Sequence, residues 1–210
     1  VLILTMGLRD KCVFLASRAE QYVQTMLCFG LMSNFTDMLV AAKIFIVIVW
    51  MGAGFSKFNH GFSSTVSVMV QNTPWMIFKS FRRKTIKNFP NDLRPSKTTH
   101  LLAHVGGTTC ELVMPLVLLF SPWGWATWIA ILSIWALHTF IISTIPLAVP
   151  LEWNVYFMFC VAFLFAGFHS SNGYSVADMD PTLLAIVVAA GLSPIILGAF
   201  KPQYVSFHVG

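Results

Sequence analysis

Charged residues are scarce in this chain, and their scarcity excludes most soluble folds. Only 10% of the 210 residues are Asp, Glu, Lys or Arg, against about 25% in a soluble domain. Apolar residues make up 57% of the chain, and the mean hydropathy is +0.75. A soluble protein of this length cannot bury so much apolar surface in one core, whereas a lipid bilayer can cover it. The composition therefore predicts an integral membrane protein.

Cysteine motifs, repeats and leader signals are lacking as well. The four cysteines form no CxxC pair, so the sequence predicts neither a disulfide framework nor a zinc site. The chain shows no internal repeat and no low-complexity tract. It begins with Val1 and has no signal-peptide layout, and we therefore expect it to be a fragment of a longer protein.

Long apolar runs dominate what is present. A spanning helix needs about 20 mostly apolar residues. Residues 1–37 mix apolar and charged side chains, which favours an interfacial or re-entrant N-terminal segment. Residues 38–210 are predicted to form an all-α, polytopic membrane helix bundle with about five transmembrane helices plus interfacial helices. The expected spans are residues 38–55, 100–120, 123–142, 151–168 and 183–200, the last of them interrupted by Pro194.

Basic residues gather in one loop, residues 56–99. Seven of the thirteen Lys and Arg residues fall between positions 79 and 97, so the positive-inside rule places this loop on the cytoplasmic-equivalent side of the membrane. Phe78, Phe81 and Phe89 alternate there with cations. That pattern suits an amphipathic segment on an anionic membrane surface or an ordinary topological anchor. RNA binding fits less well, and we expect no nucleic-acid partner.

A polar seam crosses the second expected span. His100, His104, Thr108 and Glu111 fall on one stripe of an α-helix at about 100° per residue. His138 lies at a similar depth in the next span, because it and His104 are about equally far from the turn at residues 121–122. Ionisable residues within spans are candidates for function.

The seam could be a ligand or proton site, or it could hold the helices together by hydrogen bonds, with Glu111 protonated or paired to a cation. Histidine and carboxylate suit a metal, a quinone or a carboxylate head group, and any such histidine could be an axial ligand to a pigment. The sequence requires none of these cofactors and assigns no catalytic residue.

A second candidate site is an interfacial pocket on the basic side. Lys57 could reach lipid phosphates or neutralise Glu111 or Glu152, and Glu152 is also explained by the dipole of the helix that it starts. The polar side chains expected to meet in this pocket are Lys57, Asn59, His60, Glu152 and Asn154.

Several strings of the sequence resemble a family of bacterial transmembrane proteins known only as a domain of unknown function. They are residues 9–22, 52–60, 69–74, 92–97, 103–106 with Glu111, and 146–154. Family members are longer, which agrees with a fragment, and the family implies no catalytic residue. A shorter stretch, Ser56-Lys57-Phe58-Asn59 after a glycine-rich helix end, resembles the DoxX-like and HTTM membrane domains, which implies quinone or redox chemistry.

Three functions remain open from the sequence. The first is a scaffold or accessory subunit of a larger membrane complex, contacting lipids, pigments or partner helices. The second is a membrane enzyme of the quinone, redox or lipid-modifying type that uses the His/Glu seam. The third is a small-solute or lipid transporter, which only the interruption at Pro194 supports. Expected partners are membrane lipids and other membrane subunits or the missing N-terminal part.

Overall fold

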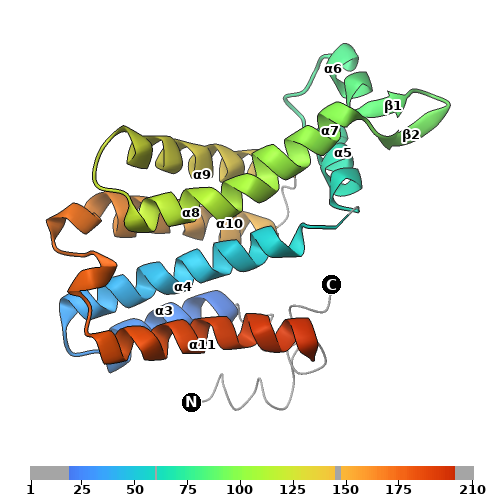
Figure 1. Cartoon of the computed structure of the whole chain (residues 1–210). Helices are drawn as coiled ribbons and strands as arrows, with labels where there is room; N and C mark the ends of the chain where they lie inside the picture. The colour runs from blue at the N-terminus through green and yellow to red at the C-terminus, as the bar shows by residue number, and fades with distance from the viewer. Residues whose placement is uncertain (1–18, 60, 145–147, 202–210) are drawn as a thin grey trace. The chain divides into compact units, whose positions relative to one another are not determined.

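The chain folds into helices grouped in two compact units (Figure 1). The computed structural model describes residues 19–59, 61–144 and 148–201. Unit 1 comprises Val1–Val49 with Phe168–Gly210, and unit 2 comprises Trp50–Gly167. The predicted all-α membrane fold is confirmed, and the strands of the described residues are confined to one short hairpin.

Among the described residues, three helices are long and apolar enough to cross a membrane: Phe35–Ser56, Lys97–Phe120 and Trp125–Thr144. They correspond to the first three expected spans. A fourth candidate is a bent pair, Leu151–Gly167 with Ser170–Asp178. The described apolar part of the fifth, Pro181–Leu197, is shorter. By length and composition, the part of the chain that the structure describes thus holds three to four candidate spans plus shorter apolar helices.

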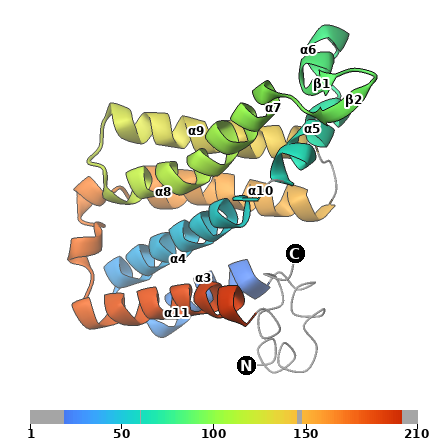
Figure 2. The ribbon, with the colours of Figure 1, turned by 45° about the vertical axis from the view of Figure 1, so that its right-hand side comes forward.

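Unit 1 is built from three helices packed side by side, as Figures 1 and 2 both show. They are α3 (Ala19–Leu31), the first part of α4 (Phe35–Ser56) and α11 (Pro181–Phe200). Short 3-10 turns, η3 (Ser170–Asn172) and η4 (Val176–Asp178), precede α11. The core of this unit joins the three helices through Cys28, Val40, Ala41, Ile44, Met179 and Val187.

The expected interruption at Pro194 is wrong, because α11 is one continuous helix from Pro181 to Phe200. Proline has no N–H, so the carbonyl four residues earlier loses its helical donor. That carbonyl belongs to Ala190, and the hydroxyl of Ser193 donates to it at 3.1 Å. A neighbouring side chain therefore replaces the missing backbone bond, and the helix needs no break.

Unit 2 holds a pair of neighbouring helices joined at the turn near residues 121–122 that the sequence indicated. α8 (Cys110–Phe120) packs against α9 (Trp125–Thr144), and α9 packs in turn against α10 (Ala148–Cys160). α10 continues as a π-helix, η2 (Val161–Gly167). Figures 1 and 2 show α8, α9 and α10 side by side.

The second span contains a π-helix, which no sequence pattern had indicated. A short α7 (Lys97–Leu101) passes into η1 (Leu102–Thr109), which passes into α8. Two threonine hydroxyls donate to carbonyls five residues earlier: Thr108 Oγ1 to Ala103 O at 3.5 Å, and Thr109 Oγ1 to His104 O at 2.8 Å. These bonds match the i→i+5 spacing of a π-helix. π-helical segments are rare in proteins, and those that occur are often found at functional sites.

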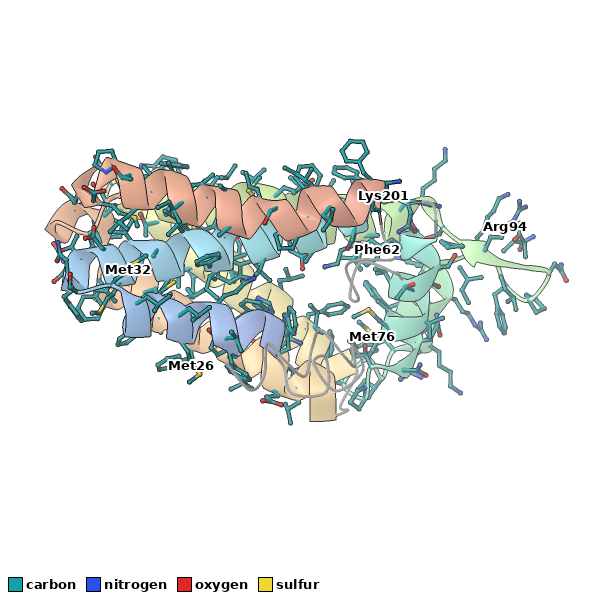
Figure 3. The ribbon with its side chains drawn as sticks, turned by 90° about the horizontal axis from the view of Figure 1, so that it is seen from below. Met26, Met32, Phe62, Met76, Arg94 and Lys201 are labelled. Atoms are coloured by element: carbon teal, nitrogen blue, oxygen red, sulfur yellow. The ribbon has the colours of Figure 1, made fainter. Side chains whose placement is uncertain are left out.

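The basic loop is structured rather than extended. α5 (Phe62–Asn72) packs Val66 and Val70 against Ala103 of η1. After it come α6 (Lys79–Lys84) and an antiparallel hairpin of β1 (Ile86–Asn88) and β2 (Asp92–Pro95). Figure 3 shows Phe62 and Met76 near opposite ends of α5, and Arg94 on the hairpin. The hairpin was not predicted, since strands of three and four residues carry too little pattern to be seen.

Candidate functional site

The described histidines and glutamate of the expected seam contact three different sets of side chains in unit 2, rather than lying on one stripe. Each group joins two or three elements of that unit. The first is an ion pair, the second a chain centred on His138, and the third a serine between two histidines.

The ion pair links Lys57, in the turn that ends α4, to Glu111 at the start of α8. Lys57 Nζ contacts Glu111 Oε2 directly, and Glu111 is only 3% exposed. Gly54 makes the approach possible, because a Cβ there would lie 2.8 Å from Leu112 Cδ2. Of the alternatives left open by the sequence, neutralisation of Glu111 by Lys57 is the one that the structure shows.

The second group is a chain of hydrogen bonds from Trp50 through His138 to Asn154. Trp50 Nε1 lies 3.0 Å from His138 Nε2, and His138 Nδ1 lies 2.6 Å from Asn154 Oδ1. An indole nitrogen can only donate, so His138 Nε2 must accept. His138 therefore carries its proton on Nδ1 and donates it to Asn154. Both ring nitrogens of His138 are used, and all three side chains are buried.

The third group is Ser63 of α5 between His100 and His104. Ser63 Oγ lies 2.7 Å from His100 Nδ1 and 3.3 Å from His104 Nε2. The two imidazoles are stacked, with ring centroids 6.3 Å apart and an interplanar angle of 18°. A hydroxyl donates one hydrogen bond and can accept another, so Ser63 can accept a hydrogen bond from one imidazole while donating one to the other. His100 is exposed and His104 is partly buried.

The expected seam is thus divided by the π-helix. Each π turn takes more residues than an α turn, so positions before and after η1 do not keep the phase assumed for an α-helix. His100 and His104 stay together, Glu111 joins Lys57, and Thr108 is buried and bonds within its own helix. His138 was expected at a depth similar to that of His104, and its ring bonds to Trp50 and Asn154.

The expected interfacial pocket is dispersed in the same way. Asn59 caps a turn, with Nδ2 donating to Ser56 O at 2.9 Å and Oδ1 accepting from Phe62 N at 2.9 Å. Asn154 is buried beside His138, and Lys57 pairs with Glu111. Glu152 is exposed at the fifth position of α10, past the first turn. His60 lies outside the described residues.

Two members of these groups were missed from the sequence, Trp50 and Ser63. Trp50 is 1% exposed with its N–H inside the bundle, and a buried indole N–H usually has a partner. That rule would have signalled a polar group near Trp50. Ser63 carried no comparable signal, because serine is common in loops. Among the described residues, no three His, Cys, Asp or Glu side chains cluster as metal ligands would.

Comparison with known proteins gives one match. The chain belongs to the family described as "Transmembrane protein of unknown function (DUF3556)", whose model matches residues 1–210. No curated protein and no solved structure matches the chain. The membrane prediction is confirmed by this family, which assigns no activity.

Proposed function

We propose that this member of the transmembrane family is a non-catalytic scaffold or accessory subunit of a larger membrane complex. The observation that supports the proposal is the pairing of buried polar groups in unit 2. Lys57 with Glu111, and Trp50 with His138 and Asn154, join segments that are distant in the sequence. Polar side chains that bond to one another hold helices together, and these two groups of contacts are of that kind.

The outward surface of α9 supplies the contact face in this proposal. Only 28% of its most apolar stretch is buried. Trp125, Trp128, Leu132 and Trp135 recur every three or four residues and are exposed, so they form one stripe on the helix. Trp135 Nε1 also donates to Met158 O at 3.1 Å, which fixes one of these indoles. Large aromatic side chains on one stripe suit packing against a partner helix or lipid.

Crosslinking from the α9 stripe tests the proposal. A photoreactive residue replaces Trp128 or Leu132 in the full chain in native membranes, and the matched control replaces Phe163, which is exposed on η2. We expect both stripe positions to give one protein adduct of defined mass, and position 163 to give lipid adducts. The partner should also copurify at a fixed ratio. Lipid adducts alone at all three positions, from a chain that purifies by itself, would overturn the proposal.

The Ser63 group favours a second candidate, a membrane enzyme with a proton or ligand site. His100 Nε2 and His104 Nδ1 have no hydrogen-bond partner among the described residues, unlike the two nitrogens of His138. The resemblance to DoxX-like and HTTM domains would imply quinone or redox chemistry here. Purified protein should then contain a quinone or metal that is lost in His104→Ala and kept in Thr108→Val. Protein that contains neither supports the scaffold instead.

A further inference from the structure

The strongest unassigned surface lies outside the spans, on residues 75–84, which we call the 75–84 segment. Its sequence is WMIFKSFRRK, with four cations and no acidic residue. Trp75, Ile77 and Phe78 are 54%, 72% and 67% exposed. Soluble surfaces rarely place so many large apolar side chains together in water. Aromatic residues beside Lys and Arg are typical of segments that lie at a membrane surface.

The segment is held in a fixed conformation by Arg82 and Gln71. Arg82 donates from Nε to Met76 O at 2.6 Å and from Nη2 to Thr73 O at 3.2 Å. Gln71 Nε2 donates to Arg82 O and to Thr85 Oγ1, both at 2.7 Å. The guanidinium of Arg82 is therefore part of the framework. The cations left to face outward are Lys79, Arg83 and Lys84.

Hydrogen bonds also place the segment beside the start of a span. Thr85, which directly follows α6, accepts at its carbonyl from Ser96 N at 3.0 Å and from Thr99 Oγ1 at 2.6 Å. Ser96 caps the candidate span Lys97–Phe120, and Thr99 lies in its first turn. The end of a transmembrane helix lies at the head-group region of a bilayer. The 75–84 segment is thus tied to the depth at which phosphate groups are found.

The cations of the segment differ from those of the neighbouring hairpin. Asp92 pairs with Arg94 at 2.7 Å and with Lys87 at 3.4 Å. In contrast, no carboxylate of the described residues forms an ion pair with Lys79, Arg83 or Lys84. Arg83 lies over the ring of Phe89 at 5.7 Å, which leaves its charge uncompensated. Three cations without a carboxylate partner therefore lie next to the exposed apolar side chains, whereas the two cations of the hairpin share one carboxylate.

We propose that the 75–84 segment binds the anionic lipid leaflet at the end of the bundle, with Trp75, Ile77 and Phe78 entering the head-group region and Lys79, Arg83 and Lys84 contacting lipid phosphates. An acidic protein could match the cations, but it would leave unexplained why exposed apolar side chains lie at this depth. The proposal needs only that the chain spans the membrane, and it does not rest on the accessory-subunit role.

Depth-dependent quenching tests the proposal on the full chain in nanodiscs. A fluorescent label is attached to Phe78→Cys in a background in which Cys12, Cys28, Cys110 and Cys160 are replaced by Ala. Discs contain phosphatidylcholine alone or with phosphatidylglycerol, and lipids brominated near the head group serve as the quencher. We expect bromolipid to quench the label and aqueous iodide to quench it weakly. Phosphatidylglycerol should strengthen the bromolipid effect.

Two variants with equal charge change give the matched control. Lys79→Gln/Lys84→Gln removes two uncompensated cations, and Lys87→Gln/Arg94→Gln removes the two that face Asp92. Each Lys or Arg near an anionic surface strengthens binding by about fivefold. In the first variant, the increase in bromolipid quenching caused by phosphatidylglycerol should therefore be at least about tenfold smaller. The second should keep most of it. A label that iodide quenches freely in both lipids, or two variants that behave alike, would overturn the proposal.

Discussion

The two units hold their buried ionisable side chains in different ways. In unit 1, Lys43 Nζ donates to the carbonyl of Tyr174 at 2.7 Å, and Asp37 Oδ1 accepts from the amide of Asp180 at 3.1 Å. Both contacts join a side chain of α4 to the backbone of the loop before α11. In unit 2, Lys57 meets Glu111, and His138 meets Trp50 and Asn154, so side chains bond to side chains.

This difference determines which positions of each unit depend on residue identity. In unit 1 the hydrogen-bonding atoms at positions 174 and 180 are a backbone carbonyl and a backbone amide, which almost any residue supplies. These two hydrogen bonds therefore specify only the α4 side chain, although Lys43 Nζ also lies 5.9 Å from the centre of the Tyr174 ring. Each contact in unit 2 specifies both partners, because the wrong residue on either side leaves a buried polar group unpaired. Replacing both contact partners should therefore restore the stability that one substitution removes in unit 2, and should not do so in unit 1.

The largest effect is expected for Lys57→Met, which leaves the Glu111 carboxylate buried without a partner. Loss of one member of a buried ion pair costs about 3–5 kcal/mol. The free energy of unfolding in mixed micelles measures it. Lys57→Met/Glu111→Met should recover most of the loss, since it removes both charges. A double variant no more stable than the single one would break the comparison.

Lys43→Met tests the other side of the comparison. It removes a hydrogen bond from a charged donor to the Tyr174 carbonyl, and bonds to charged groups contribute about 1.5–3 kcal/mol. The same unfolding measurement applies. Tyr174→Phe is the control and should not reproduce the loss, because the accepting atom is a backbone oxygen. A large effect of Tyr174→Phe would show that the tyrosine side chain carries the contact.

His138→Phe should destabilise unit 2 by about 1–3 kcal/mol, because the Trp50 N–H and the Asn154 amide then lack their partner. Thermal unfolding followed by tryptophan fluorescence measures the change. Asn154→Leu should lower the free energy of unfolding less when His138→Phe is already present than it does in the wild-type chain. Strict additivity of the two changes would mean that the two side chains are not coupled.

The smallest effect concerns a side-chain pair in water, the Asp92–Arg94 pair of the hairpin. Hydrogen bonds from Arg94 hold the pKa of Asp92 well below its usual range. A lowered pKa means that the carboxylate contributes to the hairpin above its usual pKa and loses this contribution only as the pH falls through the lowered value. We therefore expect the Arg94 Nε–H NMR signal to be unchanged from pH 7 down to about pH 3.5, which is below the usual pKa of an Asp side chain.

Arg94→Gln supplies the control for this titration. Without the guanidinium, the pKa of Asp92 should return toward about 3.9, while the stability of the spans stays the same. A wild-type Asp92 that titrates near pH 4 would contradict the expected shift.

The spans were predictable from the sequence because hydropathy depends only on composition over about 20 residues. The three helices long enough to cross a membrane begin and end within a few residues of the expected ranges. The phase of the seam was not predictable, since it assumed an α-helix throughout and η1 occupies eight residues of that span.

Of the contacts in the candidate sites, one was among the alternatives that the sequence left open and another was not foreseen. The Lys57–Glu111 pair was among the alternatives, because a buried carboxylate needs a cation and few cations are near. The His138–Asn154 contact was not foreseen, since the two residues were assigned to different sites. Its formation depends on the packing of α9 against α10 and on a donor from Trp50. Those are tertiary facts that spacing along one helix does not contain.

The chain from Trp50 to Asn154 also has a consequence for proton movement. Conduction along hydrogen bonds requires each group to receive a proton on one side and release one on the other. The Trp50 indole can only donate, so its N–H faces the lone pair of His138 and no proton can pass from the imidazole to the indole. An imidazolium at position 138 would set two N–H groups against each other. The three side chains therefore cannot relay a proton from His138 to Trp50.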